Sequence, residues 1–140
     1  MLNKKNIFIW IIIVAAVIIA SAFLLSNKQT ISLIDTDIVI MLDMEQFNEG
    51  LSMGLITVTD REKIEIVLLN LSGAIKTMRI TVNDYPIQDN YLVVRLISEK
   101  ERQTMCLYSD GGSYYVEEPY VGVYKNNRDA NAAIYSVYTG

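Results

Sequence analysis

The stretch QTMCLYSDGGSYYVE, residues 103–117, carries the clearest structural pattern of this 140-residue chain. Within 103–109, Met105 and Leu107 alternate with their neighbours, as they do in a strand that has one buried face. Asp110-Gly111-Gly112-Ser113 follows, and two glycines supply the positive φ angles that a tight hairpin turn requires. Tyr114–Glu117 then returns as the next strand, so the sequence predicts an antiparallel sheet.

Outward from this hairpin, further stretches alternate between apolar and polar residues. They predict strands over 36–46, 76–82 and 91–98. The strand at 76–82 is followed by a turn at 83–86. The stretch 47–54 reads as a loop followed by a short apolar piece at 55–58, and 120–125 reads as extended. The inward residues of the three predicted strands are Leu92, Val94 and Leu96, then Met78, Ile80 and Val82, then Ile38, Ile40, Leu42 and Met44.

Two helices complete the expected domain. Thr59-Asp60-Arg61-Glu62 has the form of a capping box, apolar residues follow at helical spacing, and Gly73 fits the stop. Asn126 or Asn127 can cap a last helix with an apolar stripe. The two apolar stripes are Ile64, Val67, Leu68 and Leu71, then Ala130, Ala133, Ile134 and Val137. The expected fold is α+β, an antiparallel sheet of four to five strands packed by one or two helices over residues 36–140.

The segment 7–25 holds nineteen residues without a charge, and thirteen of them are Ile, Val, Leu or Phe. A helix of this length spans roughly 28 Å, close to the hydrocarbon thickness of about 30 Å. It predicts a transmembrane helix, followed by a linker at 26–35. A cleaved signal peptide is the competing interpretation, because Ala20-Ser21-Ala22 has the form of a cleavage site. Phe23, however, continues the apolar run directly after that site, which favours a retained anchor.

Flanking charge sets the expected orientation. Lys4 and Lys5 precede the apolar segment and only Lys28 follows it closely. The positive-inside rule therefore predicts a cytoplasmic tip at 1–6 and an extracytoplasmic domain in a single-pass protein of the cell membrane.

The domain is acidic. From Gln29 onward there are nine Lys and Arg against all sixteen Asp and Glu, a net charge of −7. Such a surface repels phosphate backbones, so no nucleic-acid partner is expected, and it is equally unsuited to anionic lipid. The only cysteine, Cys106, lies between apolar residues and is expected in the core.

The absences in the composition limit the chemistry. There is no histidine, one cysteine and no glycine-rich phosphate loop, which removes His-dependent nucleophilic systems and the common zinc sites. Asp35-Thr36-Asp37 begins like a calcium loop, but Val39 stands at its third ligand position. Asp43 and Glu45 share a strand face and could form an acid/base pair, although such acids are commonly only solvated. No catalytic, cofactor-binding or metal-binding residues are therefore predicted, and no enzymatic activity.

Tyrosines gather near the C-terminus, where six of the nine fall between 114 and 138. Tyrosine is enriched at interfaces, so this stretch is a candidate surface for a protein or peptide partner. The alternative is that the rings cover the sheet and the last helix. The candidate surface consists of Tyr114, Tyr115, Glu117, Glu118, Pro119, Tyr120 and Tyr124.

Three motifs, TDREKI at 59–64, TVNDYP at 81–86 and YYVEEPYVGVYK at 114–125, resemble a family of uncharacterised, membrane-attached domains of Firmicutes. Their pattern is similar to VND-x-P followed by YYIE-x-PY-x-G-I-Y-K, over roughly 60–125. The resemblance implies a bacterial cell-envelope location, no established activity and variable residues after Lys125.

The leading hypothesis is thus a membrane-anchored binding or accessory domain that serves in sensing, immunity or complex assembly. A hydrolase that uses only carboxylates and a pilin-like subunit are the alternatives.

Overall fold

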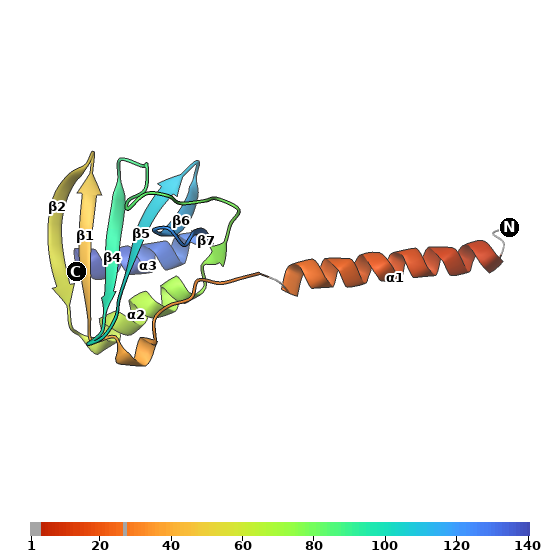
Figure 1. Cartoon of the computed structure of the whole chain (residues 1–140), viewed down its shortest axis with the longest axis horizontal. Coiled ribbons are helices and arrows are strands. Elements are labelled where there is room, and N and C mark those ends of the chain that lie inside the picture. Colours follow the sequence, from red (N-terminus) through yellow and green to blue (C-terminus); the bar gives the residue numbers. More distant parts are fainter. Residues whose placement is uncertain (1–3, 27) are drawn as a thin grey trace.

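A computed structural model describes residues 4–26 and 28–140 (Figure 1). Residues 1–3 of the predicted cytoplasmic tip and residue 27 of the predicted linker lie outside the described residues. The first helix, α1 (Lys4–Ser26), extends away from the folded domain. Of the described residues, this helix alone is long and apolar enough to cross a membrane, over Asn6–Leu24 with a mean hydropathy of 3.0, and none of it is buried.

The domain is α+β, as predicted, and its sheet is wholly antiparallel. The described residues form seven strands in the order β2-β1-β4-β5-β6-β7-β3, so the expected count of four to five was too low. The strands are β1 (Met41–Asn48), β2 (Leu51–Val58), β3 (Ile75–Lys76), β4 (Tyr91–Ile97), β5 (Arg102–Asp110), β6 (Ser113–Glu118) and β7 (Gly122–Asn126).

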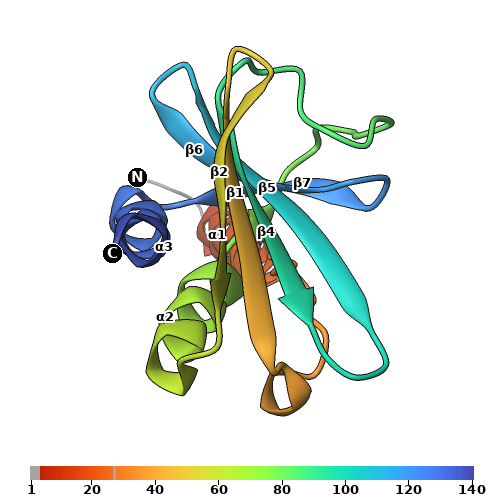
Figure 2. The same cartoon turned by 90° about the vertical axis from the view of Figure 1, so that its left-hand side faces the viewer.

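Two helices, α2 (Arg61–Ser72) and α3 (Arg128–Thr139), cover one face of the sheet (Figure 2). The apolar stripes of both helices pack on strand residues such as Leu42, Val94 and Leu107, and this forms the main core. Asn127 caps α3 through its side chain, which accepts from the amide of Ala130 at 2.7 Å.

The cap of α2 differs from the prediction. Asp60, not Thr59, accepts from the amide of Lys63 at 3.2 Å. Gly73 follows the helix as expected but with φ −84°, so this helix end does not use the left-handed conformation of a glycine stop.

Much of the predicted linker belongs to the domain. The amide of Lys76 donates to the Gln29 carbonyl at 2.7 Å, and the amide of Ile31 donates to Ala74 at 2.9 Å. The side chain of Ile31 is buried in the main core. The start of the predicted 36–46 strand is instead a short 3-10 helix, Thr36–Ile38, because Asp35 caps the amide of Asp37.

Residues 77–90, here called the strap, run across the face of the sheet opposite the helices (Figure 2). The predicted strand at 76–82 is wrong beyond Lys76, since only Ile75–Lys76 pairs with the sheet. Arg79 and Thr81 point inward: Arg79 pairs with Asp110 at 2.9 Å, and the Thr81 hydroxyl donates to the Glu117 carboxylate. The expected inward residues Met78, Ile80 and Val82 instead face solvent.

The loop predicted at 47–54 is also wrong, because it contains the turn of a β1–β2 hairpin. Asn48 pairs with Leu51, and Glu49 and Gly50 form the two-residue turn with φ of 50° and 77°. Both central residues of such a turn need positive φ. The hairpin predicted at 110–113 is confirmed, with Gly111 and Gly112 in the same conformation.

Candidate functional site

Strand β2 lies at one edge of the sheet and pairs only with β1 among the described strands. Its sequence, LSMGLITV, has no charge and no proline. Three large apolar side chains on it, Leu51, Met53 and Leu55, are 71%, 62% and 57% exposed. Natural sheets usually protect such an edge with charges, prolines or a covering segment. We call residues 51–58 the β2 edge.

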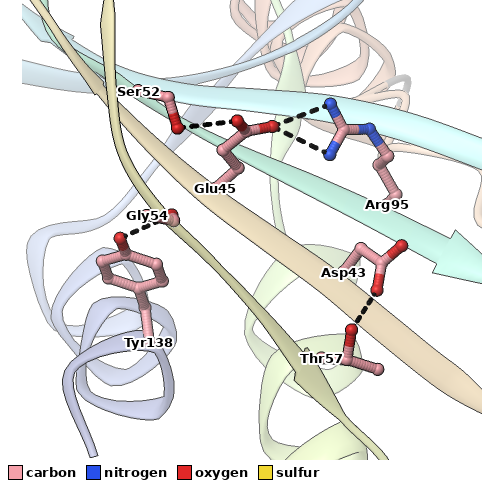
Figure 3. A network of polar contacts seen from close by, with 7 residues as sticks. All are labelled: Asp43, Glu45, Ser52, Gly54, Thr57, Arg95 and Tyr138. Carbon is pink, nitrogen blue, oxygen red and sulfur yellow. Dashed lines mark hydrogen bonds and ion pairs between the residues drawn. The ribbon is translucent and has the colours of Figure 1, made fainter.

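Polar contacts from neighbouring strands hold this edge in place on the face opposite the helices (Figure 3). The Thr57 hydroxyl donates to the Asp43 carboxylate at 2.7 Å, and Ser52 donates to Glu45 at 2.8 Å. Glu45 also accepts from the Arg95 guanidinium at 3.3 Å. These contacts help to fix β2 on the sheet.

A bulge and a tyrosine shape the middle of the edge. The register between β1 and β2 shifts at Gln46/Phe47, so that Met53 has no partner residue on β1. Gly54 takes φ +140°, and the Tyr138 hydroxyl from α3 donates to its carbonyl at 2.9 Å (Figure 3). A bulge bends an edge strand and interrupts its row of backbone groups, so the regular part of the edge is 55–58.

Asp43 and Glu45, the candidate acid/base pair, point to the same face but each already has a partner. Asp43 accepts from Thr57, and Glu45 is bound by both Ser52 and Arg95. Arg95 and Glu45 are each 20% exposed, so their ion pair is largely shielded. The arrangement anchors the hairpin, and both acids already accept hydrogen bonds from described side chains.

The seven residues of the predicted partner surface do not form one surface. Tyr115 and Glu117 are buried on the strap side, whereas Tyr124 is buried in the main core beneath the helices. Tyr120 is the most exposed of the seven, at 65%, and its hydroxyl donates to Asp84 of the strap at 2.8 Å. The remaining three, Tyr114, Glu118 and Pro119, are half-buried.

A hollow of about 330 Å³, which the sequence analysis did not predict, lies between the strap and the sheet. Tyr108, Glu117 and Val123 line it from the sheet, and strap residues including Arg79, Thr81 and Gln88 line it from above. The side-chain oxygen of Gln88 is buried and accepts no hydrogen bond from the described residues. Burial, and then the negative charge of Glu117, raises the pKa of Tyr108 to about 12.

The candidate calcium loop at 35–37 and the thiol of Cys106 lie in different parts of the domain. Within 4–26 and 28–140, no group of three or more Cys, Asp and Glu is placed to hold a metal ion. Cys106 is fully buried beside Tyr91 and Tyr108 on the strap side, as its apolar neighbours predicted. Burial is the main cause that raises its pKa to about 12, so the thiol stays protonated.

The β2 edge was missed for a physical reason. Glu49 occupies a left-handed turn position that normally selects Asn, Asp or Gly, and the chain therefore carries no recognisable hairpin signal there. The usable signal was the charge-free run 51–58, whose length matches a strand.

Comparisons with known proteins agree with this fold. Residues 27–125 match the sequence profile of a family described as "Domain of unknown function (DUF5300)". An NMR structure of a protein from Ruminococcus gnavus is similar, with a TM-score of 0.57 and 24% sequence identity over 73% of this chain and 99% of that one. No protein with a curated description matches. Because the profile spans most of the chain, from just after α1 to the end of the YYVEEPYVGVYK motif, the chain belongs to this family of domains of unknown function.

Proposed function

We propose that this chain is a membrane-anchored binding domain of the bacterial cell envelope whose β2 edge receives an extended segment of another protein. The observation that carries the proposal is the uncharged, apolar and unpaired edge at 51–58. An added strand would pair with the free backbone groups of 55–58 and cover the side chains of Leu51, Met53 and Leu55. This is the recognition mode in which backbone hydrogen bonds give affinity and alternate side chains give specificity.

The anchor supports a location at the membrane. Helix α1 exposes an apolar surface on every side, and no described part of the domain covers it. Exposed apolar area of this kind is stable only in lipid or against another apolar surface. With Lys4 and Lys5 before the helix, the positive-inside rule orients the domain to the outside.

Photo-crosslinking in native membranes tests the binding site. A photoreactive amino acid replaces Leu55 on the β2 edge, and in a matched control it replaces Leu69, which is similarly exposed on α2. A discrete adduct from position 55 that is absent from position 69 supports the proposal. Thr57→Pro, which removes a backbone donor from the regular part of the edge, should abolish the adduct. Equal labelling from both positions, or none from 55, overturns it.

Two measurements test the anchor and its orientation. Intact mass of the mature chain should include residues 7–25, and a chain that begins near Phe23 would show a cleaved signal peptide. A new thiol at Ser136, which is exposed on α3, should react with an impermeant maleimide on intact cells, while the buried Cys106 stays unlabelled. Labelling of Ser136→Cys only after lysis would place the domain in the cytoplasm.

Neither alternative gains a supporting observation. The carboxylates of the hydrolase hypothesis are engaged in the hairpin contacts described above. The proposed role therefore has no catalytic step, and sensing, immunity and complex assembly differ only in which protein supplies the added strand.

A further inference from the structure

The apolar side chains of the strap face solvent instead of the sheet. Arg79 and Thr81 use their side chains to hold the strap on the sheet, and the alternating residues face outward. Met78, Ile80 and Val82 are 101%, 87% and 68% exposed, and Ile87 near the other end of the strap is 84% exposed. Arg79 also lies over the Tyr115 ring, 4.2 Å from its centroid, so the inward and outward sides are fixed. Exposed apolar side chains on a segment whose orientation is fixed mark a surface that contacts a membrane or another protein.

A basic hollow of about 520 Å³ adjoins the start of the strap. Three exposed lysines, Lys28, Lys76 and Lys125, line it together with backbone and amide groups, and its described lining contains no Asp or Glu. The rest of the domain is acidic, with sixteen Asp and Glu in all. The expectation that the domain is unsuited to anionic lipid was drawn from net charge and did not take this local concentration of positive charge into account. Thr77 belongs to both the hollow and the strap, and it connects the lysines directly to the apolar row.

The chain path places both features next to the anchor. Helix α1 ends at Ser26, and Gln29 already accepts a hydrogen bond from Lys76 of β3. Three Cα-to-Cα steps of about 3.8 Å allow at most roughly 11 Å between these points. The headgroup layer on each side of a bilayer is about 5–8 Å deep. The hollow therefore cannot leave the vicinity of the lipid headgroups once α1 is inserted. The part of the strap that follows β3 lies on the side of the domain that faces α1 (Figure 1).

We infer that the strap and the basic hollow form a membrane-contact surface: Lys28, Lys76 and Lys125 bind the phosphates of anionic lipid, and Met78, Ile80 and Val82 enter the interface. The inference rests on the proposed anchoring of α1. Basic residues beside apolar ones are the combination that holds a protein segment in the headgroup region. Docking would fix the orientation of the domain, and the β2 edge, at the other end of the sheet from β3, would point away from the bilayer.

The test uses the full chain in lipid vesicles. Met78→Cys is labelled with an environment-sensitive fluorophore, and Met53→Cys on the β2 edge is the matched control, an exposed methionine at the far edge of the sheet. The native Cys106 is buried and stays unlabelled. In vesicles containing phosphatidylglycerol, the label at 78 should shift to the blue and be quenched by nitroxide-bearing lipid, whereas the label at 53 should do neither.

Charge removal tests the lysines. The combined change Lys28→Gln, Lys76→Gln and Lys125→Gln should reduce the docked population on the order of a hundredfold, because each lysine near an anionic surface contributes a factor of about five. Quenching at 78 should then fall to the level seen in pure phosphatidylcholine. Equal quenching at 78 and 53 overturns the inference. So does quenching at 78 that changes neither with the phosphatidylglycerol content nor with the three lysine substitutions. If the chain floats with the vesicles but the label at 78 is not quenched, the membrane-contact surface is wrong and the anchor stands. If the chain does not float, the anchoring of α1 is wrong as well.

Discussion

At the scale of single residues, burial on the strap side of β5 keeps two acidic groups protonated. The pKa of Cys106 and that of Tyr108 are both raised to about 12, first by burial and then by the charge of Glu117. Their ordinary values are 9.0 and 10.0. Above pH 9 the unfolded chain therefore releases protons that the folded chain retains.

This difference predicts alkaline destabilisation. Since the unfolded state binds fewer protons, the free energy of unfolding should fall as the pH rises from about 9 towards about 12. Urea unfolding of the full chain in detergent, measured across this range, gives the slope. Cys106→Ala combined with Tyr108→Phe should be less stable at neutral pH, because a buried thiol is lost, but should show a shallower slope. An unchanged slope would mean that neither group carries the effect.

The cap of α2 gives a second prediction at this scale. Asp60→Ala removes the acceptor for the amide of Lys63 and should lower stability by about 1 kcal/mol. Thr59 is exposed and does not cap the helix. Thr59→Ala should therefore change the free energy of unfolding little. Thermal unfolding of both variants compares the two positions directly, and a larger loss at Thr59 would restore the capping box that the sequence suggested.

At the scale of elements, side-chain contacts hold the strap on the sheet, and one of them joins Thr81 to Glu117. Thr81→Val keeps the shape of the side chain but removes the hydroxyl that donates to the buried Glu117. A buried group that loses its partner costs about 1–3 kcal/mol, and more when it is charged. Hydrogen exchange should accelerate in 77–90 first, before the sheet. Met78→Ser is the control: its side chain is fully exposed, so neither exchange nor stability should change in detergent.

The same element shows how far the sequence predicts this fold. Alternation at 92–96 and at 105–107 correctly gave the core, because the strands it marks are paired on both sides. Met78, Ile80 and Val82 alternate just as clearly, yet they face outward. Alternation shows that two sides differ, but not which side the protein covers. The polar partners that decide it, Asp110 and Glu117, come from strands more than thirty residues away.

For the candidate site, less could be read from the sequence. The tyrosine-rich stretch 114–124 is one continuous motif, but a strand sends alternate residues to opposite faces. Tyr115 of β6 lies on the strap side, whereas Tyr124 of β7, which pairs with the next residue Val116, lies beneath the helices. The β2 edge depends on strand order, which local pattern does not contain.

At the scale of the whole molecule, two surfaces lie at opposite ends of one sheet: the lysine hollow beside β3 and the unpaired edge of β2. In the proposed arrangement, the short connection after Ser26 would hold the first surface close to the bilayer. For a flexible tether the local concentration falls as its length grows. Tether length is therefore a variable that separates insertion of α1 from docking of the domain.

Ten Gly and Ser residues inserted between Ser26 and Lys28 should change docking alone. Such a tether has a root-mean-square length of roughly 16–19 Å, at about 5–6 Å times the square root of its residue number. The domain keeps every described contact, so its urea midpoint should stay the same, and α1 should still float with vesicles. Lipid quenching of the label at position 78 should fall, because the hollow is no longer confined to the headgroup layer, and the loss should be partly recovered by more phosphatidylglycerol. If quenching at 78 survives the insertion at every lipid composition, surface affinity by itself holds the domain down, and the short connection contributes nothing to its orientation.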